Sequence, residues 1–421
     1  MTSPQRRILP LLWCFAFLSY LLRTNITVAQ QLMAHELHWN NTEIGYVFTA
    51  FLLGYTIFQV PAGVFGDRFG PRLVLTVSGV WWAITTLFSG LVPGLLISNS
   101  SLALVCLLAL RFLHGIGEAS TYPVAMTAVA EWFAPSQHAF INSVIFTGST
   151  LGAAFAPPLV AHIMDAFGWR ATFYSTAIPP ALVAFLWWRA SRNGRVRRAV
   201  TSSSVTSVSW PQLITKRNIL FLCLSYFLYC YAISIFVYWL FKYLVDVRHL
   251  SIVNSGWAAS LPWLVASAAV PLIGYLSGRV SQRGRMLAGR RLIAVSGLVI
   301  SALLLSLGAG AQDVGSALAA ISIAVGLLFS TESSYWSTAI DVARQDAGAA
   351  SGLMNLAGNL GGVLSTSLVP VLVARFSWSY ALLSGSVFAL FAAACWFLLK
   401  SETTNDETTP VLSKAATGVV A

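Results

Sequence analysis

The sequence has few charged residues. They make up 9% of its 421 residues, whereas a soluble globular protein carries about 25%. A surface that meets water needs charged side chains, and here 57% of the residues are hydrophobic. Most of the protein's surface must therefore face lipid, and the two or three soluble domains that the length alone would predict are not expected.

Acidic residues are especially scarce, at 14 against 25 basic residues, which leaves a formal net charge of +11. A basic balance is one feature of nucleic-acid-binding proteins, so the positions of the charges must decide. The basic residues stand in short runs between long apolar segments, as the positive-inside rule of membrane proteins describes. We interpret them as topology signals and expect no nucleic-acid partner.

Cysteine is also infrequent. The five cysteines lie in apolar stretches and form neither a CxxC pattern nor a metal-binding spacing with histidine: Cys14, Cys106, Cys223, Cys230 and Cys395. Such residues are typical of packing positions in buried helices. The sequence also lacks a phosphate-binding loop and a nucleophile motif. We therefore expect no metal, no cofactor and no enzymatic activity.

Long hydrophobic segments are abundant. A membrane-spanning helix needs about 20 mostly apolar residues. Twelve such segments lie near residues 8–33, 43–65, 73–93, 102–130, 137–163, 170–190, 217–245, 252–278, 289–309, 314–340, 347–374 and 377–399. Six precede and six follow a polar stretch, so we predict an all-α membrane protein with twelve transmembrane helices in two pseudo-symmetric six-helix bundles, at residues 1–190 and 216–400. Residues 191–215 would form a cytoplasmic linker, and residues 401–421 a cytoplasmic tail.

The basic residues also predict the orientation. With the N-terminus inside and the helices alternating, 19 lysines and arginines lie inside, and four lie outside: Arg170, Lys242, Arg248 and Arg375. A wrong helix count would scramble this asymmetry. We therefore expect a multi-pass protein of a bacterial inner membrane or a plasma membrane, with both termini in the cytoplasm.

A compact charged motif joins the second and third predicted helices. It reads Gly63-x-x-x-Asp67-Arg68-x-Gly70-x-Arg72, and its glycines permit a tight turn and a close helix approach. Asp67 can cap a helix end or pair with basic groups, so we predict that these five residues gate the cytoplasmic side by latching the two halves together. The simpler interpretation is a turn with solvated charges.

The first predicted helix has a polar stripe at helical spacing. Tyr20, Arg23, Thr27 and Gln30 share one face of an otherwise apolar segment. A charged group inside a membrane is costly and usually faces a cavity or a partner. Because the planar fork of arginine binds both oxygens of a carboxylate and stays charged, Arg23 is a candidate anchor for an anionic substrate.

In the fourth predicted helix, Arg111, Gly115 and Glu118 share a face. Arg111 and Glu118 lie about 10.5 Å apart along the axis, so we expect each to find a partner on another helix, in water or in a substrate. A carboxyl in a low-dielectric cavity can take up a proton near neutral pH, which makes Glu118 a candidate proton carrier, with Arg111 restraining it. Alternatively, these residues only fix helix packing. His114 lies nearby, and a packed or hydrogen-bonded histidine is a simpler interpretation than a proton relay.

The second half adds three polar residues. Glu332, in the tenth predicted helix, could couple to protons or face the cytoplasmic vestibule. Asn355 and Asn359 lie four residues apart in the eleventh. Their amides could bind substrate hydroxyls, or they could form hydrogen bonds between helices.

Taken together, these segments resemble the anion:cation symporter family of the major facilitator superfamily. The similar segments cover nearly the whole chain: Tyr20–Thr27, Phe51–Pro61, Arg111–Ala119, Gly168–Arg170 and Gly358–Gly362. The charged motif that starts at Gly63 resembles the superfamily's cytoplasmic loop signature. The resemblance implies the two-bundle fold of that superfamily and secondary transport of a small organic anion, such as a sugar acid, together with protons.

The same resemblance implies roles for single residues. It implies substrate contacts at Tyr20, Arg23, Tyr55, Trp336 and Asn359. It also implies proton coupling at Glu118, with Arg111 beside it. The family usually has Asp directly before the first-helix arginine, and here this position is Leu22. The number of coupled protons is therefore left open.

Two rival functions differ from this prediction. An exporter or antiporter of small hydrophobic compounds would have a mostly aromatic pocket without an anion anchor. A membrane enzyme or sensor would need a catalytic motif or a soluble domain, and the polar segments are too short for one. We predict a monomer in the lipid bilayer, with an organic anion and a proton as its small partners.

Overall fold

The computed structural model describes residues 3–134, 137–193, 215–281, 286–343 and 347–400. Across these ranges the chain is helical, apart from short turns and one isolated bridge between Pro93 and Ile97. The predicted all-α class is confirmed. Most of the predicted linker and the whole of the predicted tail lie outside the described residues.

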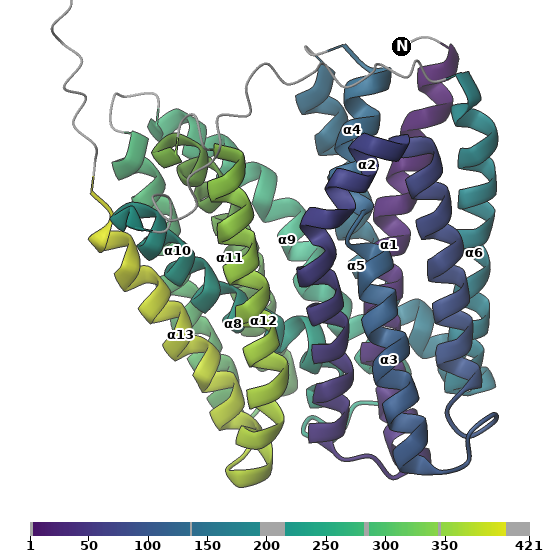
Figure 1. The fold of residues 1–421 in the computed structure, drawn as a ribbon. Coiled ribbons are helices and arrows are strands. Elements are labelled where there is room, and N and C mark those ends of the chain that lie inside the picture. Colours follow the sequence, from purple (N-terminus) through teal and green to yellow (C-terminus); the bar gives the residue numbers. More distant parts are fainter. Residues whose placement is uncertain (1–2, 135–136, 194–214, 282–285, 344–346, 401–421) are drawn as a thin grey trace, which may run out of the picture.

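The helices form two groups that lie side by side (Figure 1). The first group contains α1 (Ser3–Leu37), α2 (Asn41–Leu91), α3 (Ser100–Glu118), α4 (Thr121–Trp132), α5 (His138–Phe167) and α6 (Trp169–Ala190). The second contains α8 (Arg217–Asp246), α9 (Ile252–Ser281), α10 (Met286–Gly310), α11 (Val314–Ala343), α12 (Ala347–Arg375) and α13 (Trp378–Leu398). The two groups lie within the predicted ranges 1–190 and 216–400, and these domain boundaries stay a prediction.

Two helices differ in length from the predicted spans. At 51 residues, α2 would be about 77 Å long if straight, whereas the hydrocarbon core of a bilayer is about 30 Å thick. Gly70 interrupts it with φ 79° and ψ 153°, a backbone conformation that suits glycine. The predicted spans 43–65 and 73–93 lie on either side. Conversely, the predicted span 102–130 is divided into α3 and α4 by a turn at residues 119–120.

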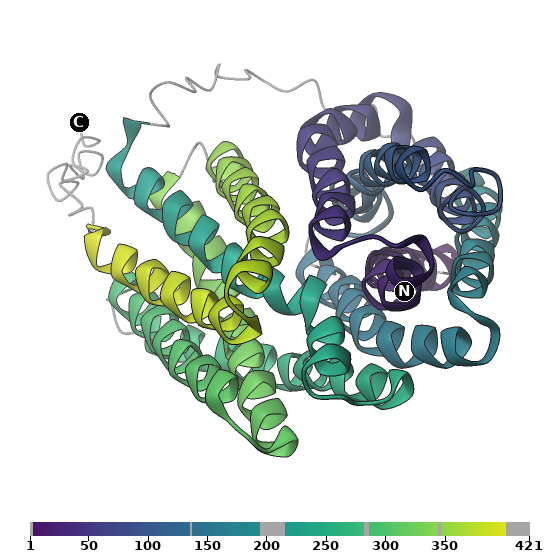
Figure 2. The same cartoon turned by 90° about the horizontal axis from the view of Figure 1, so that it is seen from below.

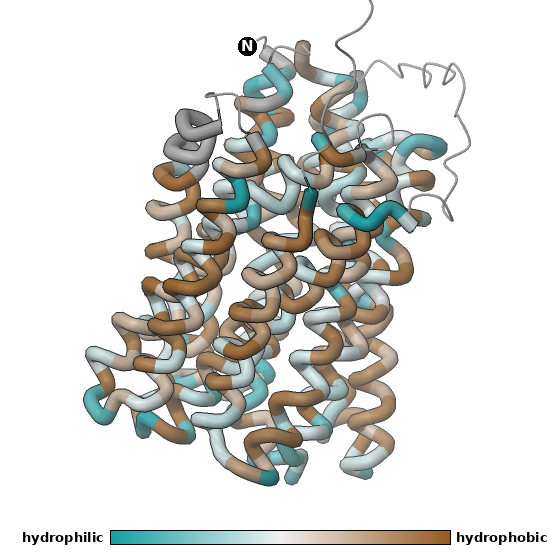
Figure 3. The backbone as a smooth tube through the Cα atoms, turned by 90° about the vertical axis from the view of Figure 1, so that its left-hand side faces the viewer, coloured by the Kyte–Doolittle hydropathy of each residue, from teal (hydrophilic) through white to brown (hydrophobic). Residues whose placement is uncertain are grey.

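Ten helical segments of the described residues are long and apolar enough to cross a membrane, by length and composition, with α2 counted once and α3 and α4 together. Because α2 contains two predicted spans and α6 matches the predicted span 170–190, all twelve predicted spans have helical counterparts. Hydrophobic residues line the length of the helices and hydrophilic residues gather at their ends (Figure 3). Many outward apolar side chains are exposed, such as Val60 at 69% and Leu307 at 66%.

Local sequence signals fix where several helices begin. The Asn40 side chain accepts hydrogen bonds from the backbone N–H of Glu43, whose carboxylate in turn accepts from the Asn40 backbone N–H. This reciprocal cap begins α2 and is worth about 1 kcal/mol. Asn99 caps α3 through the Leu102 N–H. Between α5 and α6, Gly168 has a φ of 79°, which allows the abrupt turn.

The two groups contact each other mainly at one end, which we call the closed end and define by the loops at residues 38–40 and 247–251. There, Thr49 Oγ1 of α2 lies 2.8 Å from Thr366 Oγ1 of α12. Gln31 Nε2 of α1 donates to Asp246 Oδ1 of α8 over 2.8 Å. Figure 2 views the molecule from this end. Toward the N-terminus, the ribbons of the two groups diverge (Figure 1).

Within the first group, α2 and α3 cross at two glycines. A Cβ atom built on Gly54 would overlap the Phe112 carbonyl oxygen, and one on Gly115 would overlap the Phe51 carbonyl oxygen. The two backbones therefore touch, as small residues allow in membrane helices. This crossing lies beside Arg111 and fixes the polar residues of α3 against α2.

We expect Gly115→Ala to destabilise the protein by about 1–3 kcal/mol, because the added methyl group must push two backbones apart. Thermal unfolding in detergent, followed by circular dichroism, measures this effect. Gly352→Ala is the matched control, since nothing lies within 4 Å of its Cβ position in α12. That variant should be as stable as the original or more so. Equal melting temperatures for the two variants would contradict the close crossing.

Candidate functional site

The centre of the candidate site is Glu118, at the C-terminal end of α3. Its side chain is 1% exposed. Glu118 Oε1 accepts hydrogen bonds from Arg23 Nη2 over 2.8 Å and from Arg23 Nε over 3.2 Å. The Ser19 hydroxyl, one turn before Arg23 on α1, donates to the same oxygen over 2.6 Å. Arg23 and Glu118 therefore form a buried ion pair that joins α1 to α3.

Aromatic rings surround the Arg23 guanidinium. Its Cζ lies 5.0 Å from the ring centres of Tyr20 and Tyr55 and 5.2 Å from that of Phe51. The faces of these rings attract a cation. The Arg23 side chain keeps 14% of its surface exposed, so it remains accessible while it holds Glu118. The structure thus brings together three residues that the sequence predicted as substrate contacts.

Arg111 supplies a second buried cation. Its Cζ lies 5.0 Å from the Phe51 ring centre, on α2, and its side chain is 2% exposed. Arg111 Nε has no hydrogen-bond partner within the described ranges. Of the three kinds of partner that the sequence left open for Glu118, the structure shows one on another helix, Arg23 of α1. The predicted restraint of Glu118 by Arg111 stays a prediction.

His114 connects this cluster to the part of α2 that follows Gly70. Its Nδ1 lies 2.8 Å from the Thr85 hydroxyl, and its Nε2 lies 3.8 Å from Glu118 Oε2. The interpretation of His114 as a packed, hydrogen-bonded residue is confirmed. Sequence reasoning did not find Thr85 or Ser19. The spacing of Ser19 and Arg23, one helical turn apart, is the signal that could have found Ser19.

The second group contributes an acid and an aromatic ring from α11. Glu332 Oε1 accepts hydrogen bonds from the Tyr226 hydroxyl over 3.2 Å and from Trp336 Nε1 over 3.3 Å. On α12, Asn359 Nδ2 is buried and has no partner in the part of the chain that the structure describes. The coupling role of Glu332 and the substrate roles of Trp336 and Asn359 stay predictions.

Asn355 forms a bridge between the two groups. Its Nδ2 donates to Gln59 Oε1 of α2 over 2.7 Å, and Gln59 Nε2 lies 3.4 Å from the Tyr55 hydroxyl. The structure therefore confirms the interhelical amide bond that the sequence left as one alternative for Asn355. A second bridge is aromatic, because Tyr20 contacts Trp263 of α9 edge to face, at 6.1 Å between ring centres.

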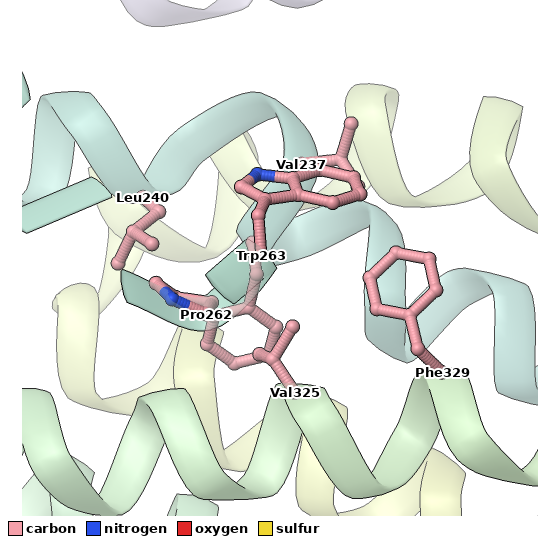
Figure 4. Close-up of a pocket in the computed structure, with 7 residues that line it drawn as sticks. Val237, Leu240, Pro262, Trp263, Val325 and Phe329 are labelled. Carbon is pink, nitrogen blue, oxygen red and sulfur yellow. The ribbon is translucent and has the colours of Figure 1, made fainter. Parts of the chain in front are cut away.

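Trp263 also borders a small apolar pocket (Figure 4). Its lining residues come from α8, α9 and α11: Phe236, Val237, Leu240, Pro262, Trp263, Val325 and Phe329. All of them are apolar or aromatic, and none is a residue that the sequence predicted for the site. The residues that line this pocket include no charged group that could hold an anion.

The other residues of the α1 stripe serve packing. The Thr27 hydroxyl donates to the Thr24 carbonyl, and Gln30 Nε2 donates to the carbonyls of Thr27 and of Tyr238 on α8. Such bonds satisfy polar groups and join helices. The stripe therefore divides into the site residues Tyr20 and Arg23 and a packing part near the closed end.

The predicted gating motif makes its described contacts within the first group. Asp67 Oδ1 accepts a hydrogen bond from the Thr127 hydroxyl of α4 over 3.2 Å. Arg72 lies 3.9 Å from the Trp188 ring centre and donates to the Trp188 carbonyl. The described cation–π contact of Arg68 is with its neighbour Phe69. These contacts fix the turn, and the gating role of Gly63, Asp67, Arg68, Gly70 and Arg72 stays a prediction.

Comparison with known proteins agrees with this architecture. The family model of the Major Facilitator Superfamily matches residues 12–366. The fold matches a crystal structure of a bacterial homologue of the human lysosomal transporter Spinster, with a TM-score of 0.81 over 95% of this chain and 97% of that chain, at 17% identity. It also matches a D-xylose–proton symporter, with a TM-score of 0.75 over 94% of this chain and 98% of that chain, at 15% identity.

Curated relatives match along most of their length. The hexuronate transporter of Bacillus subtilis is 29% identical over 89% of this chain and 90% of its own. The D-galactonate transporter of Escherichia coli is 25% identical over 94% of this chain and 96% of its own. A probable sulfoacetate transporter of Cupriavidus necator is 27% identical over 93% of each chain. The chain is a membrane transporter that belongs to the major facilitator superfamily, and its predicted place among the anion:cation symporters of that superfamily is confirmed.

Proposed function

We propose that this protein is a secondary active transporter that moves an organic acid anion across the membrane together with protons. The observation that carries the proposal is the buried ion pair between Glu118 and the partly exposed Arg23. An arginine held among aromatic rings is suited to bind a carboxylate through two parallel hydrogen bonds. The names of the relatives, which include hexuronate and D-galactonate transporters, support a sugar acid or a related carboxylate.

The ion pair also explains how a proton and an anion could be coupled. While Glu118 is ionised, it occupies the donors of Arg23. A proton that binds Glu118 removes its negative charge and releases the guanidinium to the substrate carboxylate. One proton and one monoanion then move without net charge. Each ligand therefore favours binding of the other, which is the thermodynamic requirement for coupled transport.

The second group would select among anions. Asn359 Nδ2 is buried and has no described partner, and Trp336 lies beside Glu332. An amide donor and an aromatic face suit the hydroxyl groups and the carbon skeleton of a sugar acid. We propose that Asn359 and Trp336 contact the substrate from this side. Asn355 would contact it after its bond to Gln59 opens, and Glu332 would assist coupling.

The contacts between the groups support alternating access. The described bonds that cross between the groups lie chiefly at the closed end, including those of Thr49 and Gln31. We propose that the closed end faces the outside, that both termini are cytoplasmic, and that the site is open toward the cytoplasm. Opening the closed end would require these bonds to break while the residues around Asp67 close the cytoplasmic side. The proposed transport unit is a monomer.

Uptake into proteoliposomes tests the proposed function. Radiolabelled glucuronate, galactonate, glucarate and sulfoacetate, with glucose as the neutral control, are supplied with and without an inward proton gradient. We expect one acid to accumulate about tenfold per pH unit of gradient if one proton accompanies a monoanion, and a protonophore to abolish this accumulation. Export of hydrophobic compounds without uptake of any anion would establish the rival exporter function instead.

A further inference from the structure

His114 is a buried titratable residue that the proposed transport cycle leaves unused. It lies one helical turn before Glu118 on α3 and is 1% exposed. The 3.8 Å between His114 Nε2 and Glu118 Oε2 is too long for a hydrogen bond. Neither atom has a hydrogen-bond partner among the residues that the structure describes. Two facing polar atoms that are buried and unsatisfied are costly and require an explanation.

Thr85 decides which nitrogen of His114 carries the hydrogen. Its hydroxyl oxygen lies 2.8 Å from His114 Nδ1 and 2.8 Å from the Trp81 carbonyl one turn earlier. A hydroxyl has a single hydrogen to donate. We assign that hydrogen to the Trp81 carbonyl, so the hydroxyl oxygen accepts from His114 Nδ1–H. His114 Nε2 then presents a lone pair to Glu118.

Two hydrogen-bond acceptors therefore face each other over 3.8 Å. The other oxygen of Glu118 is already occupied by Ser19 and Arg23, so Oε2 is the oxygen left for a proton. Facing acceptors repel, which agrees with a separation about 1 Å longer than a hydrogen bond. One added proton would turn this repulsion into an O–H···N hydrogen bond after a small side-chain rotation.

We propose that the transported proton is held on Glu118 Oε2 and is donated in a hydrogen bond to His114 Nε2. His114 is then a positioning residue for the proton, and the inference rests on the proposed function of Glu118. On loading, an O–H bond forms at Oε2 and the carboxylate becomes neutral. The hydrogen bonds from Arg23 to Glu118 Oε1 then lose their ionic attraction, so the guanidinium is free to bind the substrate carboxylate. On unloading, the proton leaves to water and the ion pair forms again.

The groups around this pair come from four helices. They are Tyr20 and Arg23 of α1, Tyr55 of α2, Arg111 of α3 and Tyr238 of α8. Both arginines are positively charged. A neutral ring that accepts a hydrogen bond therefore fits these surroundings better than a third cation would. The proton belongs on the carboxyl oxygen, with His114 as its acceptor.

Infrared titration of the reconstituted protein tests the inference without relying on transport. The C=O band of a protonated carboxyl is assigned to Glu118 by its loss in Glu118→Gln. In His114→Leu, we expect this band to move to higher frequency, because the hydrogen bond is lost. His114→Gln can restore an acceptor, so its band should lie between those of the original protein and of His114→Leu.

If His114→Leu does not fold, Thr85→Val replaces it, since the ring loses its anchor and the same shift is expected at smaller size. An unchanged band frequency in the folded variant would overturn the inference and leave the proposed function standing. A wild-type protein without any titrating Glu118 band would overturn both.

Discussion

Replacing Arg23 with glutamine should lower kcat/KM for uptake of the organic anion by about 100-fold or more, equivalent to about 2.7 kcal/mol of transition-state binding. Glutamine removes both the positive charge and the planar fork that a carboxylate needs. It also leaves Glu118 without the partner that donates two of its hydrogen bonds. Initial uptake rates in proteoliposomes, measured against substrate concentration, give the value.

Two controls separate the anchor role from a general effect of losing an arginine. Arg23→Lys keeps the charge but loses the fork, so we expect a loss of about tenfold. Arg217→Gln changes an exposed arginine of α8 whose described aromatic contact is Phe221, with its Cζ 5.6 Å from the ring centre. That variant should transport normally. If Arg23→Gln keeps half of the original rate, the anion is held elsewhere, and Arg111 becomes the first candidate.

Replacing Glu118 with glutamine should abolish proton-driven accumulation while leaving exchange of labelled for unlabelled substrate in place. The amide resembles the protonated carboxyl in shape and charge, so Arg23 is permanently released and the anion can still bind. No proton can leave, however, so the loaded protein is not driven by the gradient. Exchange should also become nearly independent of pH. Paired measurements of accumulation and exchange in the same vesicles distinguish the two effects.

Two further glutamates control this experiment. Glu131→Gln alters a half-buried acid at the end of α4 and should leave accumulation intact. Glu332→Gln alters the acid of the second group that binds Tyr226 and Trp336. Should Glu332→Gln lose accumulation while Glu118→Gln keeps it, the coupling proton is carried by α11, and the proposed role of the ion pair is wrong.

The helices were predictable because lipid imposes a simple rule on the sequence. Every span must be apolar over about 20 residues, so runs of hydrophobic residues placed all twelve segments. The points where helices end were not all equally predictable. The turn between α3 and α4 falls at Ala119 and Ser120, within one continuous apolar run, whereas the path of α2 through Gly70 appears in the sequence as a polar turn.

The site was predictable in its members but not in their pairing. A charged residue in an apolar segment is conspicuous, so Arg23, Arg111 and Glu118 could be singled out. Which of them meet depends on how each helix is rotated about its axis and how closely its neighbour approaches. That geometry is set by the glycine crossing and by packing over the whole bundle. The choice of Arg23 rather than Arg111 as partner of Glu118 therefore had to come from the structure.

The glycine crossing of α2 and α3 has a mechanical consequence. Because backbone touches backbone at Gly54 and Gly115, no side chain lies between the helices that could change rotamer and let them slide. We therefore expect the two helices to move as one rigid body, so that a displacement of α2 against α12 at the closed end would carry Glu118 with it. This rigid body contacts α1 at the bond between Glu118 and Arg23, so in the proposed cycle that bond would transmit helix motion to the residue that holds the anion.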